Sequence, residues 1–188
     1  MRMNREQEDG KIITVPNILS AARLCLIPVF IHLYIVRADS RMACLTLLIS
    51  GLTDILDGYI ARRFNMESRL GRALDPIADK LTQGAMLLCL VSRFPIMVYL
   101  LVLLIVKELC CGVMAALVIK RTGAVLPASW HGKLTTFLLY AAMCAHLVWI
   151  NIPSALSTAL AGVCLASMLV SFALYIVRNV SALYGRDA

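Results

Sequence analysis

Long stretches of apolar residues alternate with short polar connections along the whole chain. Six of them are long enough for a helix to cross a bilayer, which takes roughly 20 residues. Each runs without the every-second-residue alternation of a membrane β-strand, so a helical bundle is favoured over a β-barrel. The pattern therefore predicts an all-α integral membrane protein with six transmembrane helices. They are expected near residues 18–37, 42–62, 71–91, 95–119, 132–150 and 153–178.

The composition agrees with a membrane protein. The 188 residues are 61% hydrophobic and 15% charged, whereas a soluble domain has about 45–50% apolar and about 25% charged residues. No internal repeat or linker divides the chain, so we expect a single domain over residues 1–188, with residues 1–14 as a cytoplasmic tail and a short N-terminal interfacial segment. The first apolar stretch lacks a small-residue cleavage site, which argues against a cleaved signal peptide.

Basic residues are distributed unevenly between the predicted loops. If the N-terminus is cytoplasmic, the outer loops contain only Arg37, Arg41 and Arg93. The inner side contains twelve basic residues: Arg2, Arg5, Lys11, Arg62, Arg63, Arg69, Arg72, Lys120, Arg121, Lys133, Arg178 and Arg186. Loops rich in lysine and arginine stay in the cytoplasm, so we expect both termini there. The net charge of +7 then serves topology and anionic headgroups. We expect no nucleic-acid partner, because no basic helix has interleaved aromatic residues.

Four aspartates interrupt the apolar pattern. Asp54 and Asp57 are three residues apart, and Asp75 and Asp79 are four apart, so each pair shares one face of a helix. A carboxylate in or near a bilayer costs several kcal/mol unless a partner compensates it. The nearby arginines are too few for four carboxylates, whereas hard divalent cations accept carboxylate oxygens. We therefore predict two bound Mg²⁺ or Mn²⁺ ions, between which the sequence does not choose.

Small and basic residues near the aspartates fit a phosphate ligand. Two metal ions roughly 4 Å apart can clamp a phosphoanhydride during in-line displacement. Gly58 and Ala61 would let a nucleotide or phosphate approach the backbone, and the planar guanidinium of Arg62 could neutralise a phosphate oxygen. Gly71 either permits a close approach or begins the next helix. Pro76 lies either in the first turn of that helix or at a kink, and the sequence leaves both choices open.

The spacing of these residues resembles the signature of the CDP-alcohol phosphatidyltransferases. Residues 16–28 and 74–80 are also similar to the bacterial phosphatidylglycerophosphate synthase and cardiolipin synthase branches of that family. The resemblance, together with the size of the chain, implies a bacterial inner membrane. The eight positions that match the signature, over 26 residues, are Asp54, Asp57, Gly58, Ala61, Arg62, Gly71, Asp75 and Asp79.

This resemblance implies a homodimeric enzyme whose polar, metal-containing cavity opens to the cytoplasm. It would transfer a phosphatidyl group from CDP-diacylglycerol to an alcohol and release CMP. Asp79 would bind one metal and also act as the general base on the acceptor hydroxyl. The metal ligands would be Asp54, Asp57, Asp75 and Asp79. The CDP site would be lined by Asp54, Asp57, Gly58, Ala61, Arg62, Gly71 and Asp75.

Four basic residues of the second half are candidates for acceptor binding. They are Lys107, Lys120, Arg121 and Lys133. Phosphatidylglycerophosphate synthases typically have Arg-Glu where this chain has Lys107-Glu108, and a lysine in place of Thr135. They also usually carry another arginine about six residues after this pair, where this chain has apolar residues such as Val113 and Met114. These departures remove phosphate contacts. We expect glycerol 3-phosphate as the acceptor, giving phosphatidylglycerophosphate; phosphatidylglycerol, the acceptor of a cardiolipin synthase, is the alternative.

Simpler roles compete for several of these residues. Lys107 could merely pair with Glu108, and the Lys120-Arg121 pair could be a positive-inside anchor. His131 beside Trp130, and also Tyr175, fit the membrane interface. Arg23 could extend to the lipid surface or enter the cavity.

A transporter is the competing functional class. Carboxylates within a membrane can mark an ion or proton path. Transporters of this kind usually have internal repeats or broken helices at corresponding positions. Neither is found in this sequence, so an ion-coupled transporter is a remote alternative to the enzyme.

Overall fold

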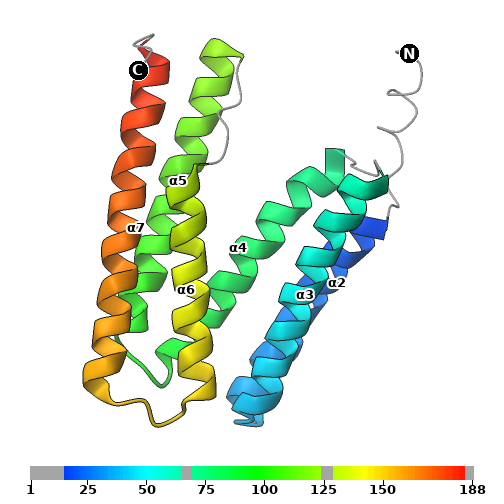
Figure 1. Ribbon diagram of the computed structural model, residues 1–188, viewed down its shortest axis with the longest axis vertical. Coiled ribbons are helices and arrows are strands. Elements are labelled where there is room, and N and C mark those ends of the chain that lie inside the picture. The colour runs from blue at the N-terminus through cyan, green and yellow to red at the C-terminus, as the bar shows by residue number, and fades with distance from the viewer. Residues whose placement is uncertain (1–14, 65–68, 124–128, 185–188) are drawn as a thin grey trace. The chain divides into compact units, whose positions relative to one another are not determined.

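A computed structural model describes residues 15–64, 69–123 and 129–184, except for the side chains of 15–17, 54, 55, 57–62, 64 and 69–75. Within these ranges the chain forms long α-helices and one π-helical turn, without a strand (Figure 1). Each of the six predicted stretches corresponds to one long helix, which confirms the all-α fold. The elements are α2 (Val15–Ile31), η1 (His32–Val36), α3 (Ser40–Phe64), α4 (Arg69–Val91), α5 (Met97–Thr122), α6 (Trp130–Val148) and α7 (Ser154–Leu183).

Three helical segments of the described chain are long and apolar enough to cross a membrane. They are Ile18–Val36, Met97–Thr122 and Ser154–Leu183, and Ser40–Thr53 is a shorter apolar helix. Many large apolar side chains on them are exposed, including Leu109, Val163 and Val177. Exposed apolar surface of this extent is expected where lipid is the solvent. The membrane character is therefore supported, while the number of six spans stays a prediction.

The chain divides into two compact units, Met1–Cys89 and Leu90–Ala188. In the first unit, α2 packs along α3 (Figure 1), and Phe30, Tyr34, Ala43 and Leu47 are buried. Asp39 caps the beginning of α3. Its Oδ1 accepts hydrogen bonds of 3.1 Å from the backbone N–H groups of Arg41 and Met42. A carboxylate at this position satisfies amides that have no partner inside the helix.

The bounds of α4 decide one of two choices that the sequence left open. The helix is described from Arg69 onward, so Gly71 lies near this end of it, and both interpretations of the glycine stay predictions. Pro76 lies inside the helix, beyond the first turn. A proline there removes one backbone hydrogen bond and is a cause of kinks. The first-turn alternative for Pro76 is therefore wrong.

The second unit consists of α5, α6 and α7. Helix α7 packs against both α5 and α6. A polar contact reinforces the α6–α7 packing: His146 is 1% exposed, and its Nε2 lies 2.9 Å from the hydroxyl of Ser157. Its Nδ1 lies 2.7 Å from the carbonyl oxygen of Ala142 and therefore donates. Helix α5 ends at Gly123, whose φ of 68° is the left-handed conformation that glycine adopts easily.

Candidate functional site

The four aspartates of the motif lie on two helices of the first unit. Asp54 and Asp57 are within α3, and Asp75 and Asp79 are within α4. Each helix is continuous over its pair, so the spacing of one helical turn, on which the prediction depends, is present in the backbone. The side chains of Asp54, Asp57, Gly58, Ala61, Arg62, Gly71 and Asp75 lie outside the described residues. The metal and CDP sites therefore stay predictions.

Asp79 is the aspartate of the motif whose side chain the structure describes. It is half-buried, and its Oδ2 accepts a hydrogen bond of 3.0 Å from Nε2 of Gln83. Gln83 follows one turn later on α4 and is 2% exposed. The amide therefore fixes one carboxylate oxygen of the residue that is expected to act as the base. Gln83 was not among the predicted site residues, although its position four residues after an aspartate is a usable signal.

Groups of three or more acidic, histidine or cysteine side chains that could hold a metal do not occur among the described side chains. Three of the four aspartates are outside that set. The donor chemistry of the motif nevertheless suits Mg²⁺ or Mn²⁺, because all four ligands would be hard carboxylate oxygens.

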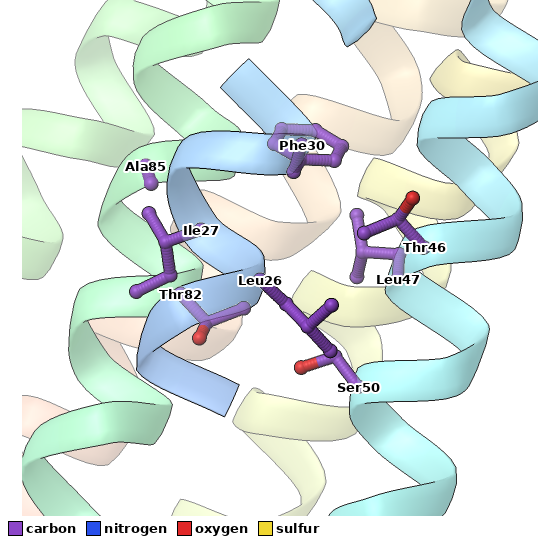
Figure 2. A pocket seen from close by; sticks show the side chains of 8 residues that line it. All are labelled: Leu26, Ile27, Phe30, Thr46, Leu47, Ser50, Thr82 and Ala85. Atoms are coloured by element: carbon purple, nitrogen blue, oxygen red, sulfur yellow. The ribbon is translucent and has the colours of Figure 1, made fainter. Parts of the chain in front are cut away.

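An apolar pocket lies within the first unit, between α2, α3 and α4 (Figure 2). The pocket is partly open to the outside, and its cavity volume is only about 10 Å³. The hydroxyls of Thr46 and Thr82 both donate to carbonyl oxygens of their own helices, at 2.8 Å. With these donors satisfied, the walls are suited to hydrocarbon and not to a nucleotide. The lining residues are Leu26, Ile27, Phe30, Thr46, Leu47, Ser50, Thr82 and Ala85.

Arg23 is a buried cation on α2. It is 2% exposed, and Ser20, one turn earlier, is fully buried. The alternative in which Arg23 extends to the lipid surface is therefore wrong, because the guanidinium of such a side chain would be exposed.

A cationic cluster lies within the second unit around Tyr175. Nζ of Lys107, on α5, is 5.9 Å from the centroid of the Tyr175 ring. Cζ of Arg178, one turn further along α7, is 5.0 Å from the same centroid. Both distances are in the range of cation–π contacts. Lys107 is 6% exposed and also pairs with Glu108, with Nζ and Oε1 3.6 Å apart.

His131, at the beginning of α6, contacts the same tyrosine. Its ring centroid is 5.0 Å from that of Tyr175, with the planes at 72°, and its Nδ1 is 3.1 Å from the hydroxyl of Ser171. His131 precedes the apolar stretch of residues 132–150. Burial lowers its pKa, and the positive charges of Arg178 and Lys107 lower the pKa further. The imidazole is therefore neutral at pH 7.

Gly132 leaves the space that Tyr175 occupies. A Cβ on this glycine would lie 2.7 Å from the tyrosine hydroxyl oxygen and 3.2 Å from Cε2 of the ring. The first distance is well inside van der Waals contact, so any larger residue here would displace Tyr175. From the sequence, Tyr175 was expected at the membrane interface, and Arg178 is one of the basic residues of the inner side. Ser171, Tyr175 and Arg178 are four and three residues apart and so share one face of α7. This spacing is the signal that could have predicted their contact.

The other predicted acceptor-binding residues lie elsewhere in the second unit. Lys120 and Arg121 are exposed in the last turn of α5, where cations also stabilise the C-terminal end of a helix dipole. Lys133 is exposed on α6. Of the four basic residues that were predicted to bind the acceptor, Lys107 is the one found in the cluster around Tyr175.

The chain is similar to known proteins over most of its length. Residues 13–179 match the family described as CDP-alcohol phosphatidyltransferase. The cardiolipin synthase (CMP-forming) of Streptomyces coelicolor is 40% identical over 145 residues, which cover 73% of this chain and 66% of that protein. The CDP-diacylglycerol–glycerol-3-phosphate 3-phosphatidyltransferase of Rickettsia typhi is 33% identical over 127 residues, covering 66% of this chain and 70% of that protein.

A probable phosphatidylglycerophosphate synthase of Mycobacterium tuberculosis is 34% identical over 134 residues, which cover 69% of this chain and 63% of that protein. The matched region thus spans about two thirds of the length of each of these relatives. The family match extends over most of the chain and includes both the aspartate motif and the cluster around Tyr175. This protein belongs to the CDP-alcohol phosphatidyltransferase family.

Proposed function

We propose that this protein is a phospholipid-biosynthetic enzyme that transfers a phosphatidyl group from CDP-diacylglycerol to glycerol 3-phosphate and releases CMP. The observation that carries the proposal is the eight-position motif on α3 and α4, within a chain that matches the family over residues 13–179. Relatives named for this reaction support the acceptor. An ion-coupled transporter has no comparable support.

The aspartates would form the metal site and part of the donor site. Asp54, Asp57, Asp75 and Asp79 would hold two Mg²⁺ or Mn²⁺ ions. When bound, such ions neutralise charge on the diphosphate and on the leaving CMP. The small residues of α3 would leave room for CDP against the backbone, and Arg62 would bind a phosphate oxygen through its planar fork. Gly58, Ala61, Arg62 and Gly71 complete the proposed CDP site.

Asp79 would act as the general base. The acceptor oxygen forms a new bond to the phosphorus of the phosphatidyl group as the phosphoanhydride bond breaks and CMP leaves. The proton of the acceptor hydroxyl passes to the Asp79 carboxylate. Gln83 supports this role, because its amide holds Oδ2 in one orientation and leaves the carboxylate fixed on α4 for the reaction.

The acceptor phosphate would bind to the cluster in the second unit. A dianion requires cationic partners, and Lys107 and Arg178 provide two that lie against one tyrosine ring. Their origin from two different helices allows them to contact a phosphate from more than one side. His131 would add no charge at pH 7, because its pKa is lowered. We therefore assign Lys107 to the acceptor and add Arg178; Lys120, Arg121 and Lys133 stay further candidates.

A cardiolipin synthase is the second candidate function. It is favoured by 40% identity to the Streptomyces coelicolor protein of that name and by Thr135, where phosphatidylglycerophosphate synthases typically have a lysine. Its acceptor, phosphatidylglycerol, carries one phosphodiester charge and needs fewer cations and more apolar surroundings.

We also propose six membrane spans, a cytoplasm-facing polar cavity, both termini in the cytoplasm of a bacterial cell, and a homodimer in the inner membrane. The uneven distribution of arginine and lysine supports the orientation. Residues 1–14, proposed as a cytoplasmic tail of a single domain, lie outside the described residues.

The test is CMP release by the purified protein in detergent, with Mg²⁺, CDP-diacylglycerol, and either glycerol 3-phosphate or phosphatidylglycerol. Turnover with glycerol 3-phosphate, lowered by Lys107→Met and unchanged by Arg93→Met, is the expected result. Arg93 is exposed outside the helices and serves as the matched loss of one charge. Turnover with phosphatidylglycerol alone would establish the second candidate, and no CMP release with either would refute both.

A further inference from the structure

We propose that Tyr175 is a positioning residue, which holds Lys107 and Arg178 in place for the phosphate of the acceptor, and that Gly132 is required because it leaves room for the tyrosine hydroxyl. The inference deepens the proposed function and rests on it in one respect: the acceptor must carry a phosphate. Both glycerol 3-phosphate and phosphatidylglycerol meet that condition.

Three helices of the second unit converge on Tyr175. Lys107 reaches the ring from α5, His131 from α6, and Arg178 from the next turn of α7 itself. Tyr175 is thus the contact that the three side chains share. Without the ring, each cation has a long side chain with many rotamers, and their like charges favour separation. A ring that attracts both limits these rotamers and opposes that separation.

The type of contact suits anion binding. A guanidinium or ammonium that lies against an aromatic face is attracted by the ring quadrupole, which does not use the in-plane N–H donors as a carboxylate would. The ring therefore orients the guanidinium of Arg178 without serving as one of its in-plane hydrogen-bond partners. Glu108, at 3.6 Å from Lys107 Nζ, offsets part of the cost of a cation that is 6% exposed.

The tyrosine itself is fixed from the side of α6. His131 stands edge-on to the ring, and its Nδ1 is 3.1 Å from the hydroxyl of Ser171, one turn before Tyr175 on α7. The lowered pKa of His131 supports this arrangement, because a neutral imidazole adds no third positive charge. Gly132 follows directly in the chain, and the tyrosine hydroxyl fills the volume that a Cβ would take.

Three tyrosine variants test the positioning role through the Michaelis constants. Tyr175→Leu removes the ring and is expected to raise KM for glycerol 3-phosphate about tenfold, as two weakened cation contacts imply. KM for CDP-diacylglycerol is expected to change by less than about twofold. This second constant serves as a control, because a misfolded site would alter both constants. Tyr175→Phe keeps the ring and is expected to stay near the wild type. Tyr184→Leu, on a tyrosine that is 73% exposed near the end of the same helix, is the matched control.

A double substitution tests the role of Gly132. Gly132→Ala forces the hydroxyl of Tyr175 away from its position and is expected to raise KM for the acceptor. Combining it with Tyr175→Phe removes the closest contact, at 2.7 Å, so most of the loss is expected to be recovered. Such non-additivity is the sign of two residues in direct contact. Equal or additive losses in the double variant would overturn the steric argument.

A binding measurement without turnover separates this inference from the choice of acceptor. Inorganic phosphate is expected to raise the melting temperature of the wild-type protein in detergent and to have no such effect on Tyr175→Leu. That result without turnover of glycerol 3-phosphate would keep the phosphate site and reject that acceptor. Turnover of glycerol 3-phosphate with an unchanged acceptor KM in Tyr175→Leu would overturn the positioning role and leave the proposed function intact. Replacing glycerol 3-phosphate by phosphatidylglycerol in the same assay identifies which phosphate the cluster binds.

Discussion

Replacement of Gln83 tests how much the proposed base depends on its neighbour. Gln83→Met keeps the length of a side chain that is 2% exposed, so the packing of α4 is largely preserved. It removes the amide that donates to Oδ2 of Asp79 at 3.0 Å. The carboxylate then loses a donor that restricts its rotation. We expect a slower reaction by a protein that remains folded.

The size of the effect follows from the type of bond. A hydrogen bond to a charged group contributes about 1.5–3 kcal/mol in soluble proteins, whereas polar contacts between membrane helices average about 0.6 kcal/mol. The burial of Gln83 favours the larger energy, whereas the location of Gln83 and Asp79 on the same helix favours the smaller energy. About 1.4 kcal/mol corresponds to a tenfold change. We therefore expect kcat to fall about tenfold, with KM for CDP-diacylglycerol changed by less than about twofold.

Two further variants make this measurement decisive. Gln83→Glu has the same size but places a second carboxyl group beside Asp79, so it is expected to lower kcat more than Gln83→Met. Thr82→Val is the matched control: Thr82 is a buried neighbour whose hydroxyl donates to Ala78 at 2.8 Å and not to Asp79. CMP release gives kcat and KM, and melting temperatures report the fold. A wild-type kcat in Gln83→Met, or an equal loss in Thr82→Val, would refute the reasoning.

Three other results are expected. Asp79→Asn should abolish CMP release without lowering the melting temperature, and full activity would refute the role of Asp79 as the base. EDTA should abolish CMP release reversibly, with Mg²⁺ or Mn²⁺ restoring turnover, and full activity in EDTA would refute the metal requirement. Ser157→Ala leaves Nε2 of His146 without the hydroxyl 2.9 Å away, a cost of about 1 kcal/mol, so the melting temperature should fall by about 2–4 °C at unchanged KM. The pKa of His131 in the folded protein is below its ordinary 6.5. As the pH falls through 6.5, the unfolded chain therefore binds a proton more readily than the folded one, and the free energy of unfolding should decrease. His131→Gln lacks this titrating group, so its free energy of unfolding should decrease less.

The helices could be predicted from the sequence because their cause is local. An apolar stretch of about 20 residues satisfies its backbone in lipid only as a helix, and each of the six stretches is helical in the described residues. The spacing of the aspartates survives for the same reason. The position of Pro76 within its helix could not be predicted, because a sequence places the end of a helix only to within a few residues.

The cluster around Tyr175 depends on packing between helices and could not be predicted in the same way. Lys107 was recognised as a candidate, but its neighbour across the helix interface is 68 positions further along the chain. An aromatic residue near the end of an apolar stretch also fits the membrane interface, and an arginine nearby fits the positive-inside rule. Those interpretations are consistent with the sequence, but the sequence does not contain the contact between the helices. Gly132 is the clearest example, because a Cβ there would collide with the Tyr175 side chain of another helix.

Arg178 changes the argument about the acceptor. The sequence suggested that this chain lacks a fork-shaped phosphate contact, because Lys107 stands where an arginine is typical. A lysine provides a point charge, whereas an arginine binds two oxygens of one phosphate through a planar fork. The structure places the guanidinium of Arg178 against the same ring as Lys107, and we propose that Arg178 supplies this contact from α7. Under this proposal the departure at Lys107 counts less against glycerol 3-phosphate. Two departures still count against it: Thr135, and apolar residues such as Val113 and Met114 where an arginine is usual.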